Sequence, residues 1–552
     1  MNKQIIFVDD SVQDYQSLIQ NIDRAQVFIL KENLSAIEQI TNALNNQKNI
    51  SALHILSHGS PGSVNLGTEE LNENNLENCS QQLKQWGKAL TQNADILLYG
   101  CEVAKGEAGH NFLKRLSEIT DANIAASATP TGSAELGGDW NLEVQIGDIS
   151  TPVPFNANTL KTYSGVLGFA PKVDFPTGSS PFFLSIGDFN GDGRPDLAVA
   201  NIGSNTASIL LNTTATNATT PTFATQVTFA TGTGPYSVSI GDINGDGRPD
   251  LAVANIDSNT ASILLNTTPT GAATPTFATQ VTFPTGTSPR SVSIGDFNGD
   301  GRPDLAVANT DSNTASILLN TTPTNATTPT FGTQVTFPTG AGGYPRSVSI
   351  GDINGDGKPD LATANNGSDT ASILLNTTPT NATTPTFATQ VTFPTGSFPV
   401  AVSIGDFNGD GRPDLAVANS DSNTASILLN TTPTNATTPT FATQVTFPTG
   451  TNPREVSIGD INGDGKPDLA VANSFSNTAS ILLNTTPTNA TTPTFATGVT
   501  FATGDGPYSV SIGDINGDGK PDLAVANYYS YNASILLNTT PKVSIAAGTT
   551  PT

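Results

Sequence analysis

A repeated segment of fifteen residues constrains this chain more than any other feature. The segment GDFNGDGRPDLAVAN (Gly187–Asn201) recurs six more times with few changes, and its first aspartate stands at positions 188, 242, 296, 352, 406, 460 and 514. The spacing is 54 residues in every interval except one of 56. Self-similarity at this period is the signature of a repeat architecture, so everything after about residue 169 is expected to form one array.

Each period is expected to contain four short β-strands. Between Ser291 and Gly340 they are SVSIGD, DLAVAN, TASILLN and TFGTQVTF, separated by Gly, Pro, Asn and Thr turns. One four-stranded unit cannot close a hydrophobic core, whereas seven units arranged radially can. We therefore predict an all-β, seven-bladed β-propeller over residues 169–540, with a linear β-solenoid as the alternative.

The two ends of the array predict how the ring closes. FAPKVDF (169–175) matches the fourth strand of the other units, whereas the array ends on a third strand, ASILLNTT (533–540). We expect residues 169–175 to pair with 533–538 and so complete the last blade. The segment KVSIA (542–546) is the rival for the same edge.

Every copy carries an oxygen-rich loop of the form Asp-x-Asn-x-Asp-Gly-x-x-Asp. Side chains at loop positions 1, 3, 5 and 9 and the backbone carbonyl of position 7 offer hard oxygen ligands, which favour Ca²⁺. An EF-hand is excluded, because position 12 is Val199 rather than glutamate and the flanking segments are strands. We expect up to seven structural calcium ions. The expected ligands are Asp188, Asn190, Asp192, Arg194, Asp196, Asp242, Asn244, Asp246, Arg248, Asp250, Asp296, Asn298, Asp300, Arg302, Asp304, Asp352, Asn354, Asp356, Lys358, Asp360, Asp406, Asn408, Asp410, Arg412, Asp414, Asp460, Asn462, Asp464, Lys466, Asp468, Asp514, Asn516, Asp518, Lys520 and Asp522.

With these loops and strands, the array resembles the FG-GAP or integrin-alpha-like propeller family. The resemblance implies a platform for binding or adhesion in which calcium is structural rather than catalytic. Extracellular calcium modules bind the ion with a Kd of roughly 10⁻⁴ to 10⁻³ M. The resemblance therefore implies a location outside the cell or on its surface.

The acidic composition narrows the choice of partners. The formal net charge is −25, and the seven loops hold 21 of the 47 acidic residues. Nucleic acid is not an expected partner, because binding phosphates needs clustered Lys and Arg. No apolar stretch approaches the ~18 residues of a membrane helix, so no membrane insertion is expected. MNKQIIFVDD reads as a strand rather than a signal peptide, so we expect export without a cleavable N-terminal signal.

Residues 1–148 are expected to form a separate α/β domain. Apolar strands are expected at 5–8, 27–30, 53–56, 95–99 and 124–127, with helices between them, one of which starts at a capping box from Ser35 to Glu38. Such alternation predicts a mostly parallel sheet with helices on both faces. We expect a linker over 149–168, and a tail or the start of a further β module over 541–552.

A histidine and a cysteine follow neighbouring strands of this domain. His58-Gly59 follows the third strand and Gly100-Cys101 the fourth, at the sheet edge where ligands bind. A thiol beside an imidazole is the pair needed for nucleophilic catalysis, and the backbone N–H groups of Gly59 and Cys101 are candidates for an oxyanion hole. In the alternative interpretation, His58 makes a local hydrogen bond and Cys101 packs as a small apolar residue.

ILSHGSPGSVNLG and DILLYGCEVAKG resemble the His-Gly loop and the strand-to-cysteine segment of caspase-like cysteine peptidases. The whole domain is still more similar to an uncharacterised module at the N-termini of large, repeat-rich bacterial surface proteins. It departs from the caspase pattern in having Tyr99 and Gly100, rather than Gln-Ala, before the cysteine. Glu102, next to the thiol, would oppose thiolate formation.

The array is also expected to have a face on which its units differ. Six residues before each first aspartate stand Phe182, Tyr236, Arg290, Arg346, Val400, Arg454 and Tyr508, and the loop between the second and third strands of the last unit adds Tyr528, Tyr529 and Tyr531. Tyr and Arg dominate binding hot spots. We expect a protein or glycan ligand on this face, opposite the calcium loops, with the aromatic side chains exposed.

Two functions follow from these features. The first is a secreted or cell-surface bacterial binding or adhesion protein with a calcium-stabilised propeller. The alternative is a cysteine endopeptidase with a His58/Cys101 dyad, whose propeller recruits substrate or anchors the enzyme.

Overall fold

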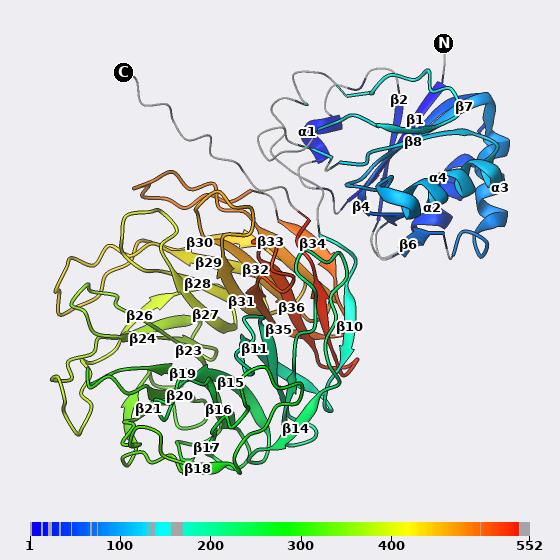
Figure 1. Cartoon of the computed structure of the whole chain (residues 1–552). Helices are drawn as coiled ribbons and strands as arrows, with labels where there is room; N and C mark the ends of the chain where they lie inside the picture. Colours follow the sequence, from blue (N-terminus) through cyan, green and yellow to red (C-terminus); the bar gives the residue numbers. More distant parts are fainter. Residues whose placement is uncertain are drawn as a thin grey trace, which may run out of the picture. The chain divides into compact units, whose positions relative to one another are not determined.

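A computed structural model of the chain contains two compact units, which are described separately (Figure 1). The first consists mainly of residues up to Pro171 and also takes in Asn462–Asp464 and the residues from Asn538 on, and the second is built from Lys172–Ile461 and Gly465–Leu537. The structure describes residues 3–539 apart from 11, 13–14, 20–21, 23–24, 32–34, 46, 67–68, 74, 130, 133–138, 156–159, 161–168 and 497. The expected tail at 541–552 and the rival segment 542–546 lie outside these residues.

The first unit contains a six-stranded sheet in the order β2-β1-β3-β7-β8-β9. All neighbouring pairs are parallel except β8–β9, which confirms the predicted mixed α/β domain. The strands are β1 (Lys3–Asp9), β2 (Ala25–Leu30), β3 (Ile50–Leu56), β7 (Leu90–Tyr99), β8 (Asn123–Ala126) and β9 (Val144–Ile146).

Successive side chains of these strands enter two different cores, because side chains alternate across a strand. Ile5 and Phe7 join the core beneath α2 (Ala36–Leu44), α3 (Ser80–Ala89) and α4 (Gly106–Thr120). Ile6 and Val8 join the core on the opposite face, with α1 (Tyr15–Ile19). The α2 helix starts at the expected cap, where the Ser35 hydroxyl accepts a hydrogen bond from the Glu38 N–H at 3.2 Å.

Part of the expected linker belongs to the first unit. Phe155 is buried in the core that contains Tyr99, and Ile149 and Leu160 pack against that core. The backbone N–H groups of Ser150 and Thr151 donate to the Asp95 carboxylate. Residues 149–151, Phe155 and Leu160 are therefore packed on the sheet of the first unit.

A small three-stranded antiparallel sheet was not predicted. It consists of β4 (His58–Ser60), β5 (Ser63–Leu66) and β6 (Glu69–Asn72). His58 therefore lies in a paired strand, opposite Asn65, and not in an open loop.

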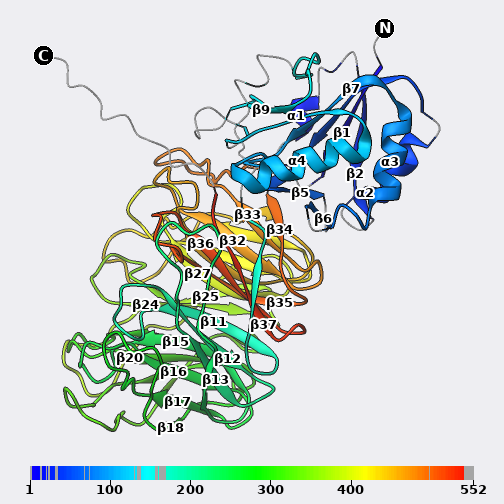
Figure 2. The same cartoon turned by 45° about the vertical axis from the view of Figure 1, so that its right-hand side comes forward.

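The second unit contains seven four-stranded antiparallel sheets, which confirms the four strands expected for each repeat (Figures 1 and 2). The first strands are β11 (Pro181–Gly187), β15 (Pro235–Gly241), β19 (Pro289–Gly295), β23 (Pro345–Gly351), β27 (Pro399–Gly405), β31 (Pro453–Gly459) and β35 (Pro507–Gly513). The second strands are β12 (Asp196–Asn201), β16 (Asp250–Asn255), β20 (Asp304–Asn309), β24 (Asp360–Asn365), β28 (Asp414–Asn419), β32 (Asp468–Asn473) and β36 (Asp522–Asn527). The third strands are β13 (Thr206–Leu210), β17 (Thr260–Leu264), β21 (Thr314–Leu318), β25 (Thr370–Leu374), β29 (Thr424–Leu428), β33 (Thr478–Leu482) and β37 (Asn532–Leu536). The fourth strands are β14 (Val227–Ala230), β18 (Val281–Pro284), β22 (Val335–Pro338), β26 (Val391–Pro394), β30 (Val445–Pro448), β34 (Val499–Ala502) and, in the seventh sheet, β10 (Val173–Pro176).

The seventh sheet takes its fourth strand from the start of the array, as predicted. Val173 and Phe175 of β10 pair with Ile535 and Ala533 of β37, and the Ser534 hydroxyl donates to the Asp174 carboxylate at 2.6 Å. A strand exchange between the ends of the array is thus confirmed.

Adjacent sheets of the second unit pack face to face through apolar side chains. Ala198 and Ile209 of the first sheet share a core with Val238, Leu251 and Val253 of the second. In the first and second sheets DLAVAN is buried along its whole length, as expected for a strand that is covered on both faces.

The first strands lie side by side in sequence order, and β35 lies beside β11. A serine of one first strand donates a hydrogen bond to a carbonyl of the next. These pairs are Ser185–Val238, Ser293–Val348, Ser403–Val456, Ser457–Val510 and Ser511–Leu184, at 2.7–3.1 Å. Among the described strands each sheet stays open, and none curls round to pair its own first and fourth strands. None of the described helices is long and apolar enough to cross a lipid bilayer.

Candidate functional site

The loop between the first and second strands of each sheet folds back on itself through its aspartates. In the first sheet, the Asp188 carboxylate accepts hydrogen bonds from the N–H groups of Asp192 (3.1 Å) and Gly193 (2.8 Å). The Asn190 side-chain oxygen accepts from the same Asp192 N–H at 3.2 Å. Gly193 has φ of +82°, a conformation that favours glycine. The side-chain oxygens of positions 1 and 3 thus gather on the inside of one turn.

The aspartate at position 9 has a different role from the others. Asp196 is fully buried, and its two oxygens accept hydrogen bonds from the Phe189 N–H (2.9 Å) and the Asn212 N–H (2.7 Å). It therefore ties the loop to the end of the third strand. Burial, together with the nearby carboxylates of positions 5 and 1, raises the pKa of Asp196 to about 7. The corresponding pKa is also raised to about 7 at Asp250, Asp304, Asp360 and Asp414.

Positions 3 and 7 connect each loop to its surroundings. The Asn190 amide donates to the Ala272 carbonyl of the next sheet at 3.1 Å, and the Asn190 carbonyl accepts from the Gly271 N–H. The same contact joins the seventh sheet to the first, from Asn516 to Ala218. The Arg194 side chain pairs with Asp192 and donates to a backbone carbonyl at the end of the third strand. The loops and the connectors between third and fourth strands therefore lie on one face.

The donor set fits a hard divalent cation in part. In the first loop, the carboxylates of Asp188 and Asp192 lie close enough to Asp196 to raise its pKa, and all the polar side-chain atoms at positions 1 and 5 are oxygens. However, position 9 uses both oxygens on backbone N–H groups. Within the part of the chain that the structure describes, no group of three His, Cys, Asp or Glu side chains is arranged as a complete metal site. Positions 1, 3 and 5 are the side chains that would hold the ion.

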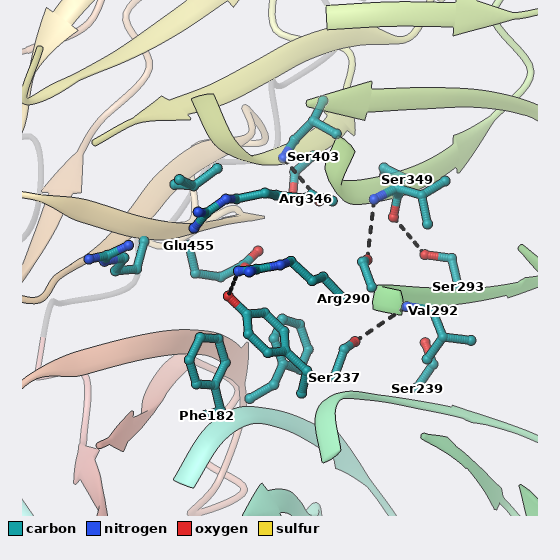
Figure 3. A pocket seen from close by; sticks show the side chains of 18 of the residues that line it. Phe182, Ser237, Ser239, Arg290, Val292, Ser293, Arg346, Ser349, Ser403 and Glu455 are labelled. Atoms are coloured by element: carbon teal, nitrogen blue, oxygen red, sulfur yellow. Dashed lines mark hydrogen bonds between the residues drawn. The ribbon is translucent and has the colours of Figure 1, made fainter. Parts of the chain in front are cut away.

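At the opposite end of the first strands, the seven variable positions line one cavity of about 280 Å³ (Figure 3). Its wall includes Phe182, Tyr236, Arg290, Arg346, Val400, Arg454 and Tyr508. Each first strand has a β-bulge after its initial proline, where two successive residues lie opposite one residue of the partner strand. The bulge accounts for successive side chains, such as Arg454 and Glu455, both reaching the cavity.

Each arginine of the cavity lies against an aromatic ring from a neighbouring sheet. The guanidinium carbon of Arg290 is 5.0 Å from the centre of the Tyr236 ring, and one of its N–H groups donates to the Tyr236 hydroxyl at 2.9 Å. The other pairs are Arg346 over Phe398 at 5.1 Å and Arg454 over Tyr508 at 4.9 Å. Such cation–π contacts orient the guanidinium planes and partly offset their desolvation.

The aromatic residues form a packed cluster rather than the exposed arc that was expected. Phe182 lies 3.8 Å from Tyr236 and 4.6 Å from Tyr508 between ring centres, and Tyr508 lies 5.0 Å from Tyr528. These four side chains are half-buried. Tyr529 (59% exposed) and Tyr531 (52%) are the only exposed members of the expected set.

Glu455 is a cavity residue that sequence reasoning missed. Figure 3 shows its carboxyl group in the same cavity as the side chains of Arg290 and Arg346. Burial raises the pKa of Glu455 to about 8. It is the only glutamate after Glu143 in the whole chain, and that isolation was the available signal. Phe398, which supports Arg346, was missed as well.

In the first unit, the His58 and Cys101 segments lie against each other, as predicted. The Ser57 N–H donates to the Tyr99 carbonyl at 3.0 Å, and a Cβ atom added to Gly59 would lie 3.1 Å from the Cys101 carbonyl oxygen. Cys101, however, is only 1% exposed, and its sulfur accepts a hydrogen bond from the Thr131 N–H at 3.3 Å. His58 is also buried. The oxyanion role of the Gly59 and Cys101 N–H groups stays a prediction.

The model of the FG-GAP-like repeat matches six overlapping stretches, 188–253, 242–307, 296–363, 352–417, 406–471 and 460–525. Together they span residues 188–525, more than half of the chain, and contain all seven aspartate loops. The chain belongs to the FG-GAP-like repeat family. Repeats of this family indicate a protein of the binding or adhesion type.

A second family model matches the part of the chain that precedes the FG-GAP-like repeats. Residues 5–167 match a domain of unknown function, DUF4347, so the chain combines the uncharacterised module with the repeats, as the sequence predicted. The resemblance of the DUF4347 domain to caspase-like peptidases stays a prediction. The match extends through residues 149–155, which pack on the sheet of the same domain.

Solved structures similar to the chain include two crystal structures of BBS1N in complex with ARL6DN, one soaked with lead and one with mercury. They are 14% and 13% identical, have TM-scores of 0.43, and the matches cover 68% of this chain and 99% of each solved chain. No curated protein matches the chain.

Proposed function

We propose that this protein is an extracellular or cell-surface binding protein whose seven FG-GAP-like sheets form a closed, seven-bladed propeller. Four contacts between the ends of the array support closure: β35 beside β11, the Ser511–Leu184 and Asn212–Ile515 hydrogen bonds, and the exchanged strand β10. A linear solenoid would leave the first and last sheets far apart. In the closed ring, one end of the first strands carries the aspartate loops and the other end carries the cavity.

The loops are proposed to hold up to seven structural calcium ions. The side chains of positions 1, 3 and 5 supply the hard oxygens, and a bound cation would neutralise carboxylates that otherwise repel one another. Position 9 keeps the loop closed by binding backbone N–H groups. Extracellular calcium modules bind the ion with a Kd of roughly 10⁻⁴ to 10⁻³ M. Sites of this affinity would be filled outside the cell, and for this reason we propose an extracellular location.

The ligand, a protein or a glycan, is proposed to bind on the cavity face. The observation that carries this proposal is the convergence of the seven variable positions on one cavity, while the opposite ends of the same strands are nearly identical. Concave sites with aromatic walls and a few charged groups are typical of ligand binding. Tyr529, which is exposed and packs against Tyr528 of the aromatic cluster, and Tyr531, exposed in the same loop, would extend the contact surface.

The test is binding of the full-length protein, in millimolar calcium, to an array of neutral and acidic glycans and to a panel of surface proteins. Replacing Tyr236, Tyr508 and Tyr528 together by alanine is expected to abolish the binding and leave calcium-dependent melting unchanged. Binding that survives this variant, but is lost when the connectors beside the aspartate loops are altered, would place the ligand on the other face.

Peptide hydrolysis is not part of this proposal, because the Cys101 thiol is buried and buried thiols react poorly. With iodoacetamide under native conditions, Cys79, which is half-buried, is expected to react before Cys101. Rapid labelling of Cys101 that is lost in the His58→Ala variant would instead support the endopeptidase function.

A further inference from the structure

We propose that the cavity binds a carboxylated sugar residue, with its carboxylate on the arginines and its ring against the aromatic wall. This inference rests on the proposed function and names the ligand class of the same face. It draws on four observations: where the cations of the array are placed, how they are paired, what lies beside them, and how large the cavity is.

The cations of the array are concentrated in the cavity. Between residues 172 and 537 the sequence contains eleven Lys and Arg residues. Seven of them occupy position 7 of the aspartate loops, and one more is Lys172, beside Asp174. The remaining three, Arg290, Arg346 and Arg454, all line the cavity. In a protein with a net charge of −25, this is a local concentration of positive charge that would attract an anion.

The three guanidinium groups have few anionic partners. The only carboxylate on the cavity wall is Glu455, and the described residues form no ion pair within 4 Å between it and these arginines. The Nε atoms of Arg290 and Arg346 are buried without a hydrogen-bond partner in the described structure. Burial lowers the pKa of Arg346, and the nearby charges of Arg290 and Arg454 lower it further.

A cluster of three half-buried arginines is unfavourable without a counter-ion, because burying unpaired charge carries a large desolvation penalty. The aromatic rings hold the guanidinium faces. On the guanidinium edges, Arg290 Nη1 donates to Tyr236 and Arg454 Nε donates to Ser474, and the other N–H groups are the ones proposed to bind the ligand. Guanidinium edges match the planar oxygens of a carboxylate and can bind it bidentately. The cavity is therefore suited to an anion, and in particular to a planar one.

The remaining wall favours a sugar as the carrier of this carboxylate. Phe182, Tyr236 and Tyr508 pack together beside the arginines and contribute to the wall of the same cavity. A sugar ring has an apolar face that can stack on such rings, whereas the side chain of Asp or Glu has no ring to place there. At about 280 Å³ the cavity is at the small end of ligand sites, which suits one terminal residue rather than an oligosaccharide.

The test uses ligand pairs that differ in one group. Binding of the methyl glycosides of glucuronic, galacturonic and N-acetylneuraminic acid is compared with methyl glucoside and methyl galactoside by titration calorimetry of the full chain. At least one acidic glycoside is expected to bind at least tenfold more tightly than the neutral ones. Equal binding of acidic and neutral glycosides, or binding of none of the acidic ones, would overturn the proposal.

Two non-sugar probes test the role of the ring. Glutarate and a Glu-rich peptide carry carboxylates without a sugar ring, and both are expected to bind at least tenfold more weakly than the best acidic glycoside. Binding of either one as tight as that glycoside would overturn the assignment to a sugar and favour an acidic protein segment as the occupant.

Variants then locate the site. Arg346→Gln is expected to weaken binding of the acidic glycoside roughly 10- to 100-fold, which is the range for losing a hydrogen bond to a charged group. Arg346→Lys, which keeps the charge but not the planar fork, should fall between Gln and wild type. Arg115→Gln removes one exposed arginine from the first unit and should leave the affinity for the acidic glycoside unchanged. Unchanged binding in Arg346→Gln with a native melting curve would contradict the proposal.

The outcomes also separate this inference from the proposed function. If the full chain binds neutral glycans or a protein, and the triple tyrosine variant abolishes that binding, the proposed ligand face stands and only the acidic sugar is wrong. If an acidic glycoside binds but the triple variant and Arg346→Gln have no effect on it, both are wrong.

Discussion

At one end of the seven first strands of the array, the same aspartate loop occurs seven times; at the other end, the residues differ from sheet to sheet. The loops use their side chains on their own backbone and on the next sheet, as Asn190 does with Ala272. The cavity arginines instead contact side chains, as Arg290 does with Tyr236, and leave polar atoms such as Arg346 Nε without a partner in the described structure. The comparison indicates that one end of the strands maintains the assembly and the other end is adapted for recognition.

Removal of calcium should reveal this division most strongly. At a free calcium concentration ~100 times Kd, each independent site adds roughly 2.7 kcal/mol to the free energy of unfolding. A chelator is therefore expected to lower the melting temperature of the second unit by at least about 10 °C and leave that of the first unit unchanged. Differential scanning calorimetry with and without chelator measures both, and identical curves would refute calcium-dependent stability.

Within one loop, positions 9 and 1 should respond differently to substitution. Asp304→Ala leaves the buried N–H groups of Phe297 and Asn320 without an acceptor, so it should cost about 3 kcal/mol even with chelator present. Asp296→Ala, in the same loop, should cost about 1 kcal/mol with chelator and more in calcium. Urea unfolding under both conditions compares the two variants, and equal losses would show that position 9 acts only as a ligand.

Neutralising an arginine should have opposite effects at the two ends. Arg346→Met removes a desolvated charge without an ion-pair partner among the described residues, so the free protein should gain about 1 kcal/mol in stability. Arg302→Met loses an ion pair with Asp300 and a hydrogen bond to Asn320, and it should lose up to about 1 kcal/mol. A loss of stability in both variants would mean that the cavity arginines are structural.

The last expected effect concerns pH. Because burial raises the pKa of Glu455 from 4.5 to about 8, the native state binds this proton more tightly than the unfolded state. The contribution of Glu455 to stability is therefore full below about pH 4.5 and falls as the pH rises to 8. Relative to Glu455→Gln, the wild type should lose stability between pH 5 and 8. Parallel curves for the two proteins would show that Glu455 is solvated in the native state.

The repeats made the second unit largely predictable from sequence. Seven copies of the same four-strand pattern fixed the sheets, and the mismatch between FAPKVDF and ASILLNTT at the two ends of the array indicated the exchanged strand. The cavity could be anticipated only in part. Simple alternation places Arg454 and Glu455 on opposite faces of a strand, and it is the bulge after Pro453 that accounts for both being in the cavity.

In the first unit, the parallel sheet and its helices followed from the alternation of apolar strands with helical segments. The environment of Cys101 did not, because it depends on the Thr131 N–H, thirty residues away in a segment without a strong pattern. The pairing of His58 with Asn65 in β4 and β5 was missed for a similar reason. Both strands are too short to show a clear alternation of apolar and polar residues.

The exchanged strand also sets a condition on how this protein is made. Asp174 and Ser534, whose side chains are hydrogen-bonded, are separated by 360 residues of chain. Closing so long a loop costs about 5 kcal/mol in chain entropy, and at 5–20 residues per second the ribosome needs on the order of tens of seconds to deliver the second partner. Throughout that time β10 lacks its partner strand β37. A chain truncated anywhere before β37 would keep this edge exposed. Because unpaired strand edges promote aggregation, we expect truncated products to aggregate or to be degraded.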